Sequence, residues 1–188
     1  MTHRIILAAC LSVLALPAVA QPAAPAPKDD LRVALDTDKG RAPLTTANFL
    51  QYVDAGRFDG EGFYRAFKYG GGGIVQGGVT SDARKLYPPV AHEPTSVTGL
   101  TNKAWTIAMA NSGPGTARSD FFIMTTDIPA FDANGADIGF AAFGKVVEGQ
   151  EVVKAILASP VSPTRGEGSM KGQMLEPAVK IVKAERLQ

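Results

Sequence analysis

Residues 106–125 read TIAMANSGPGTARSDFFIMT. Two apolar runs, 106–110 and 121–125, flank a segment that is rich in Gly, Pro and Ser. Short apolar runs bounded by turn-forming residues are typical of buried strands, and Gly, Pro and Ser favour turns and irregular loops. The stretch therefore predicts two strands joined by an irregular connection.

The rest of the chain contains further strand patterns and few helical ones. Strands are predicted over residues 31–37, 74–76, 140–147 and 178–184, and helices over 45–55 and 150–158. Thr45 or Thr46 is expected to cap the first helix. Residues 70–73 are expected to form a flexible glycine stretch, and residues 88–99 a loop. Many strands with two widely separated helices, and no β-α-β rhythm, favour a β-barrel or sandwich capped by helices.

The first residues have the layout of an export signal. Arg4 precedes a short apolar run, and Ala18-Val19-Ala20 supplies the small residues of a cleavage site before Gln21. We therefore expect a periplasmic or secreted protein. Lipidation of Cys10 is a rival interpretation, because residues 7–10 (LAAC) resemble a lipoprotein box.

Three segments of the chain are expected on this basis. Residues 1–20 are a predicted signal peptide, residues 21–28 a Pro/Ala-rich linker, and residues 29–188 a single domain. A domain of this length is large enough to bury a hydrophobic core of its own.

Composition excludes several classes of function for the processed chain. Loss of Arg4 would reduce Lys+Arg from 19 to 18, against 18 Asp+Glu, so the net charge would be zero. A neutral chain is a poor nucleic-acid binder. Cys10 is the only cysteine, and His92 would be the only histidine left, so we expect no thiol nucleophile, no metal site and no cofactor.

Three sequence blocks are more specific than the element pattern. They are FYR (63–65) followed by QGG (76–78), IAMAN (107–111) followed by SDFFI (119–123), and FGKVVEG (143–149). In order and spacing they resemble the F-H-R…Q-G-G, M-A-N/R…S-Q-F-F-I and F-G-K-V-x-x-G blocks of the cyclophilin family of peptidyl-prolyl isomerases, particularly its exported bacterial members. The resemblance covers nearly all of residues 31–187.

The resemblance implies a mainly β fold, an eight-stranded antiparallel barrel capped by two helices, with a shallow groove on its outer surface. Family members usually open with a two-stranded hairpin before the first helix. Here only residues 38–43 separate the first predicted strand from the helix region. Either the barrel lacks one N-terminal strand, or the linker supplies it.

The resemblance also implies catalysis of rotation about the peptide bond before proline, which breaks no bond and needs no nucleophile. Arg65 matches the donor to the proline nitrogen, and Gln76 the side chain that orients it. Asn111 matches the position that holds the peptide main chain, and Phe122 the floor of the proline pocket. Other matched substrate-binding positions are Ile74, Ala110, Asp120, Phe131 and Phe140. The implied partners are proline-containing segments of unfolded or exported proteins, bound by a monomer without a transmembrane segment.

Several positions depart from the family pattern. Gly73 stands where the family has a pocket phenylalanine, Asp120 where it has glutamine, and Ala130 where it has a large aromatic residue. Asp120 is expected either to pair with Arg65 or to favour basic substrates. The leading hypothesis is an isomerase that assists the folding of exported proteins. The alternative is a cyclophilin-fold peptide-binding module or chaperone with weak or no isomerase activity.

Overall fold

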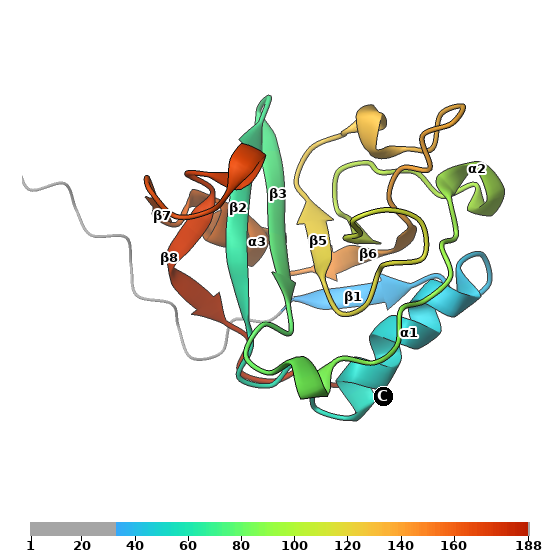
Figure 1. The fold of residues 1–188 in the computed structure, drawn as a ribbon, viewed down its shortest axis with the longest axis horizontal. Helices are drawn as coiled ribbons and strands as arrows, with labels where there is room; N and C mark the ends of the chain where they lie inside the picture. Colours follow the sequence, from blue (N-terminus) through green and yellow to red (C-terminus); the bar gives the residue numbers. More distant parts are fainter. Residues whose placement is uncertain (1–32, 188) are drawn as a thin grey trace, which may run out of the picture.

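The structure is a computed structural model that describes residues 33–187. Its strands form one antiparallel sheet of eight, in the order β1-β6-β4-β5-β3-β2-β8-β7 (Figure 1). The strands are β1 (Ala34–Thr37), β2 (Gly62–Tyr69), β3 (Gly72–Gly78), β4 (Thr106–Met109), β5 (Phe121–Met124), β6 (Ala142–Glu148), β7 (Val161–Ser162) and β8 (Met174–Lys180). The prediction of a mainly β fold with eight antiparallel strands is confirmed.

Within residues 33–187, three helices accompany this sheet, and the two longer ones pack against it. The helices are α1 (Pro43–Asp54), α2 (Thr95–Thr98) and α3 (Gln150–Ala158), with single 3-10 turns η1 (Ala83–Lys85), η2 (Pro129–Phe131) and η3 (Gly168–Met170). The two longer helices lie where the sequence predicts them, whereas α2 interrupts the predicted loop 88–99. Helix α3 packs against β2 and β3. Phe49 of α1 inserts among Phe58, Phe121 and Phe143, with ring centroids 5.1–5.3 Å apart, so α1 also covers the core.

Helix α1 begins differently from the prediction. Its first residue is Pro43, and no side chain of its N-cap residue makes a capping bond. Thr45 and Thr46 instead lie inside the helix with buried hydroxyls. The Glu93 carboxylate accepts hydrogen bonds from the main-chain N–H groups of Leu44 (3.2 Å) and Thr45 (2.7 Å). A distant carboxylate therefore satisfies the helix start, which no local pattern reveals.

The central strands bury side chains on both of their faces. In β5, Phe121 and Ile123 join the main core, while Phe122 and Met124 belong to a second cluster on the other face. We call this second set the outer cluster: Ile74, Ala108, Phe122, Met124 and Ile128, with Phe67, Ala110, Phe131 and Phe140 packed against it. Successive residues of a strand point to opposite faces, so a strand buried on both faces has an uninterrupted apolar sequence.

The glycine stretch 70–73 is not a loop throughout: Gly70 and Gly71 form a tight turn, while Gly72 and Gly73 belong to β3. Strand β2 runs to Tyr69 and β3 starts at Gly72, so only two residues form the turn of this β-hairpin. Figure 1 shows the two strands side by side. Gly70 has φ 55°, the left-handed conformation that glycine adopts at low cost.

The last strand was also predicted in the wrong place. Strand β8 covers Met174–Lys180, not 178–184. Beyond it, the Ile181 N–H donates to the Glu61 carbonyl (2.8 Å) and the Gly60 N–H to the Ile181 carbonyl (2.9 Å), outside any regular strand. The alternation of apolar and polar residues in 178–184 does not show where the partner strands end. The bounds of β8 are set by its pairing with β2 and β7. Strands β2 and β7 were not predicted.

One strand precedes α1 within the described residues. A turn follows β1, closed by a bond from the Ala42 N–H to the Asp38 carbonyl (2.9 Å), and β1 is an end strand of the sheet. The predicted signal peptide, and the linker that was considered as the source of another strand, lie outside the described residues. Over residues 33–187, none of the helices has the length and hydrophobicity needed to cross a bilayer.

Glu61 is a buried carboxylate that ties the start of β2 to the segment after β3. Its side chain is 2% exposed and lies 2.9 Å from Lys85 Nζ. It also accepts bonds from the N–H groups of Thr80 (3.0 Å) and Ser81 (3.1 Å), and from the Ser81 hydroxyl. Burial opposes ionisation, but the hydrogen bonds outweigh it and lower the pKa of Glu61 from 4.5 to about 2.

We predict that Glu61→Gln lowers the free energy of unfolding by about 1–3 kcal/mol at pH 7, because the amide cannot accept all four bonds. A depressed folded-state pKa stabilises the protein above the unfolded value and loses its effect as pH falls toward the folded value. Denaturant unfolding should therefore show the difference from wild type narrowing between pH 4.5 and about 2. Exposed Glu167→Gln is the matched control, and a difference that does not change with pH would contradict the assignment.

Candidate active site

The position of Arg65 depends on an irregularity in β2. Phe63 pairs with Gly77 and Arg65 with Gln76, so Tyr64 is an extra residue between two consecutive pairs. Such a β-bulge changes which face the following side chains occupy. Phe63 packs against the main core, and the bulge allows Arg65 to lie on the opposite face with Gln76.

Strand register then brings the predicted site residues together. Arg65 of β2 pairs with Gln76 of β3, Gln76 pairs with Phe122 of β5, and Phe122 pairs with Ala108 of β4. Directly opposed residues in a sheet lie on the same face. The sheet thus places a cation, an amide and an aromatic ring side by side, beside the outer cluster.

Two glutamine carbonyls hold the Arg65 side chain. Its Nη1 donates to Gln76 Oε1 (2.7 Å), and its Nε donates to Gln173 Oε1 (2.8 Å). Burial lowers the pKa of Arg65 from its ordinary value, although a guanidinium stays charged at any physiological pH. No residue in 33–187 accepts a hydrogen bond from Nη2. Arg65 is therefore a fixed cation whose Nη2 can still donate hydrogen bonds to a ligand.

Three aromatic rings of the outer cluster pack together, and two of them, Phe131 and Phe140, are partly exposed. Phe122 is 2% exposed, and the half-buried Phe131 and Phe140 contact it edge-on, with centroids at 5.5 and 5.1 Å. The centroids of Phe131 and Phe140 are 4.8 Å apart. Ile74 is buried in the same cluster, and Ala110 packs against it. An apolar surface of this kind suits a small ring such as that of proline.

Asn111 lies beyond β4, and its side chain, but not its main chain, is hydrogen-bonded within residues 33–187. Its side-chain amide is occupied, because Nδ2 donates to the Gly139 carbonyl (3.3 Å) and Oδ1 accepts from the Gly113 N–H (3.1 Å). Its main-chain N–H and C=O bond to nothing in the part of the chain that the structure describes. Both main-chain groups can therefore bind an extended peptide.

Asp120 does not form an ion pair with Arg65, which was one of its two expected roles. Its Oδ1 accepts from the Tyr64 hydroxyl (2.6 Å), and its Oδ2 accepts from Ser119 Oγ (3.3 Å). Burial raises the pKa of Asp120, while these two bonds oppose the shift. The carboxylate is thus already bound within the protein.

The family model described as cyclophilin type peptidyl-prolyl cis-trans isomerase/CLD matches residues 26–186. The chain belongs to the cyclophilin family.

Curated relatives give the same assignment. Peptidyl-prolyl cis-trans isomerase A of Dickeya dadantii is 40% identical over 131 residues, covering 68% of this chain and 65% of that protein. Isomerase cyp18 of Streptomyces antibioticus is 35% identical over 144 residues, 72% of this chain and 82% of that protein. Isomerase B of Escherichia coli is 32% identical over 131 residues, 66% of this chain and 77% of that protein. The aligned region thus spans just under two thirds of the Dickeya protein.

Sequence reasoning missed one aromatic residue of this cyclophilin's site. Phe67 pairs with Ile74 and packs against the outer cluster, and the Arg65 Cζ lies 5.8 Å from its ring centroid. Gly73 cannot carry the family's phenylalanine here, because a Cβ at its φ of 154° would lie 2.0 Å from the Phe67 carbonyl oxygen. Phe67 therefore supplies an aromatic ring to the outer cluster, whereas Gly73 pairs with Lys68, one position away from the Phe67–Ile74 pair. The Phe67–Ile74 pair would have been predictable from a two-residue turn at Gly70.

The other surface features of residues 33–187 lie apart from the predicted site residues. Two shallow surface hollows, one bordered by Val53 and Arg186 and one by Leu44 and Val90, contain none of the predicted site residues. Within residues 33–187 no three His, Cys, Asp or Glu side chains are grouped to hold a metal. His92 Nε2 lies 2.9 Å from the Ile138 carbonyl and links two loops.

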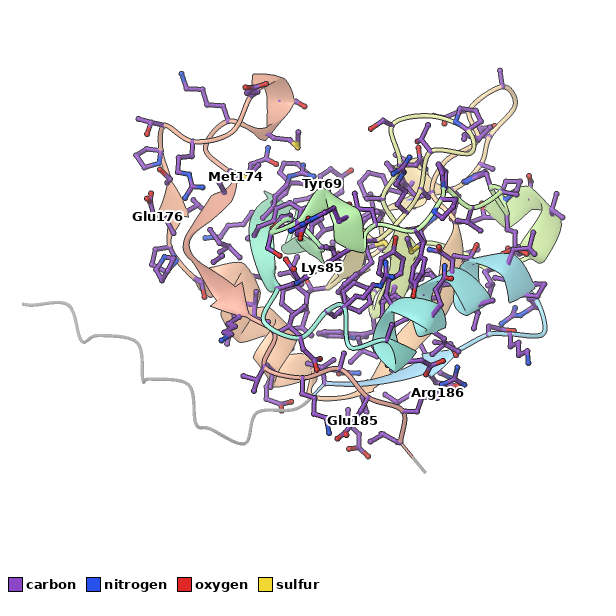
Figure 2. The ribbon with its side chains drawn as sticks, turned by 60° about the horizontal axis from the view of Figure 1, so that its bottom comes forward. Tyr69, Lys85, Met174, Glu176, Glu185 and Arg186 are labelled. Carbon is purple, nitrogen blue, oxygen red and sulfur yellow. The ribbon has the colours of Figure 1, made fainter. Side chains whose placement is uncertain are left out.

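We predict that Phe67→Ala raises KM for a proline-containing test peptide by about tenfold or more, since substrate would complete the burial of this half-buried ring, and full burial of a Phe side chain contributes about 1.5–3 kcal/mol. Tyr69→Ala is the matched control, because Tyr69 is an aromatic residue on the same strand but 48% exposed (Figure 2). Steady-state isomerisation kinetics measure the change. An unaltered KM in Phe67→Ala, with the fold intact by circular dichroism, would show that Phe67 does not contact substrate.

Proposed function

We propose that this protein accelerates cis–trans rotation of X-Pro peptide bonds and thereby assists the folding of exported proteins. One observation carries the proposal: Arg65 is fixed by Gln76 and Gln173, with Nη2 free of partners among residues 33–187. It lies on the same face of the sheet as the rings of the outer cluster.

Rotation of a prolyl bond requires only that the twisted state be favoured. The barrier of about 18–20 kcal/mol arises from amide resonance, which is lost at the top of the barrier. The proline nitrogen then gains a lone pair that can accept a hydrogen bond. A guanidinium N–H of Arg65 placed at that nitrogen would bind the twisted state better than either planar isomer, which is differential binding of the transition state.

The neighbouring groups would hold the rest of the substrate. Phe122, Phe131 and Phe140 supply a surface for the proline ring, and the unpaired main-chain groups of Asn111 can bond to the peptide backbone. The reaction transfers no electron or group, so these contacts suffice without a cofactor. The proposed substrates are proline-containing segments of unfolded or exported proteins, bound by a monomer.

The alternative function, peptide binding with weak or no turnover, rested on the departures at Gly73 and Asp120. Phe67 contributes an aromatic ring to the outer cluster although position 73 is glycine, and Asp120 is bonded to Tyr64 rather than to Arg65. Neither departure disturbs the arginine, so both observations favour turnover.

We predict that Arg65→Ala lowers kcat/KM for prolyl isomerisation by about 10²-fold, the usual effect of removing one transition-state donor. Arg65→Lys should recover little, because an ammonium group cannot bond to both glutamines while presenting a further donor in a fixed direction. Arg84→Ala is the control, since the Arg84 side chain is 92% exposed. A wild-type protein that does not accelerate isomerisation over buffer would refute the enzyme function and leave the binding module.

We also predict export with cleavage before Gln21. The full-length gene expressed in a Gram-negative host should yield a periplasmic protein whose mass corresponds to a chain starting at residue 21. Ala18→Lys combined with Ala20→Lys should leave the uncleaved precursor, because the cleavage site requires small residues. An intact chain in the cytoplasmic fraction would contradict export, and a lipid-modified Cys10 at the N-terminus would support the rival interpretation.

A further inference from the structure

We propose that Tyr64 and Asp120 form a positioning pair that fixes the orientation of the Gln76 amide and, through it, the guanidinium of Arg65. The inference rests on the proposed isomerase function. Tyr64 and Asp120 do not bond directly to Arg65 and would act on it through Gln76.

A continuous chain of hydrogen bonds joins the carboxylate to the guanidinium. The Tyr64 hydroxyl donates to Asp120 Oδ1 (2.6 Å) and accepts from Gln76 Nε2 (2.7 Å). The other end of the same amide, Gln76 Oε1, accepts from Arg65 Nη1 (2.7 Å). Three bonds therefore connect Asp120 to Arg65, and each is short.

The direction of every bond follows from the charge at one end. An ionised carboxylate can only accept, so the Tyr64 hydroxyl must donate to Asp120 and turn its lone pairs toward Gln76. The Gln76 NH₂ must then face Tyr64, which leaves the carbonyl oxygen for Arg65. With a neutral partner at position 120, the hydroxyl could reverse and the amide could flip, bringing an NH₂ group against a guanidinium that can only donate.

Tyr64 is suited to this role by its protonation and by its place in the bulge. Burial and the neighbouring Asp120 raise the pKa of Tyr64, so the hydroxyl keeps its proton. Tyr64 is the extra residue of β2, and it reaches Gln76 from the position next to Arg65. The bulge thus brings the phenol and the guanidinium to the same amide.

The surroundings of Asp120 accommodate the carboxylate closely. A Cβ on Gly78 would lie 2.8 Å from Asp120 Oδ1, so only glycine leaves the required space. Ser119 Oγ bonds to the other carboxylate oxygen (3.3 Å) and accepts from the Val79 N–H (3.2 Å). No cation in residues 33–187 forms a salt bridge with Asp120. A half-buried carboxylate without an ion pair is costly, and here its shortest hydrogen bond is to the Tyr64 hydroxyl.

Both members of the pair differ from the family blocks quoted above, which have histidine at the position of Tyr64 and glutamine at that of Asp120. The two replaced residues bond directly to each other. Two residues that contact each other are expected to differ from the family together when one replacement requires the other.

The test is a double-mutant cycle with Tyr64→Phe, Asp120→Asn and the double variant, assayed for prolyl isomerisation. Each single variant should lower kcat by about tenfold with KM little changed, because the substrate surfaces remain. The double variant should have a kcat no lower than that of the less active single variant, since both changes break the same chain of hydrogen bonds. Tyr64→His combined with Asp120→Gln, the family pair, should recover most of kcat. Asp36→Asn, on the exposed part of β1, is the control.

A second measurement separates positioning from general destabilisation. The NMR signals of the Arg65 Nε–H and the Gln76 side-chain amide should shift in Tyr64→Phe and Asp120→Asn, while the melting temperature shows whether the variants are folded. Tyr64→Phe keeps the ring, so it serves if Asp120→Asn does not fold. Wild-type kcat in both single variants, losses that multiply in the double variant, or unshifted signals would overturn the inference. An inactive wild type would instead refute the proposed function, and the NMR shifts would still decide the inference.

Discussion

Strand β2 has one more residue than β3 between the pairs formed by Phe63 and Arg65, and the direction of the side chains beyond that point depends on it. Without Tyr64 as an extra residue, strict alternation would place Arg65 on the face of Phe63, in the main core, where an unpaired guanidinium would be very costly. With the bulge, Ala66 fills the core and both Arg65 and Phe67 lie on the outer face. The bulge is therefore the condition for the site.

The outer face also carries partly exposed apolar side chains, among them Phe131 and Phe140. Phe131 and Phe140 lie outside the main core and need another means of fixation. The Asn102 side chain, 1% exposed, supplies it, because Nδ2 lies within bonding distance of the carbonyls of Phe131 (2.9 Å) and Phe140 (3.2 Å) and of Asp132 Oδ1 (2.9 Å). A buried amide between two loop segments keeps the rings in place, so the aromatic surface is preorganised before substrate arrives.

The sequence predicted the elements whose signal is local. The apolar runs of β4 and β5 and the amphipathic α3 are visible without knowledge of their partners. Strand β2 was missed because its bulge interrupts the alternation, and β7 because it has only 2 residues. The bounds of β8 were wrong because they depend on pairing with strands far away in the chain.

The candidate site divides in the same way. The family resemblance pointed to Arg65, Gln76 and Phe122, because motif blocks identify single positions. It could not identify Tyr64, Phe67 or Gln173 as neighbours of Arg65. The positions of Tyr64 and Phe67 depend on the register of the β2–β3 hairpin. Gln173 contacts Arg65 although it lies 108 residues further along the chain.

The identity of the groups around Arg65 also has a chemical consequence. Both side chains that hold it, Gln76 and Gln173, are neutral amides, and no salt bridge to Arg65 occurs within residues 33–187. A carboxylate in direct contact would hold the guanidinium more strongly, but it would also cancel much of the positive potential at the free N–H groups. Placing the charge of Asp120 two side chains away separates the two tasks. The carboxylate determines the direction of the hydrogen bonds, and the amides hold the arginine without neutralising the potential that the substrate nitrogen would experience.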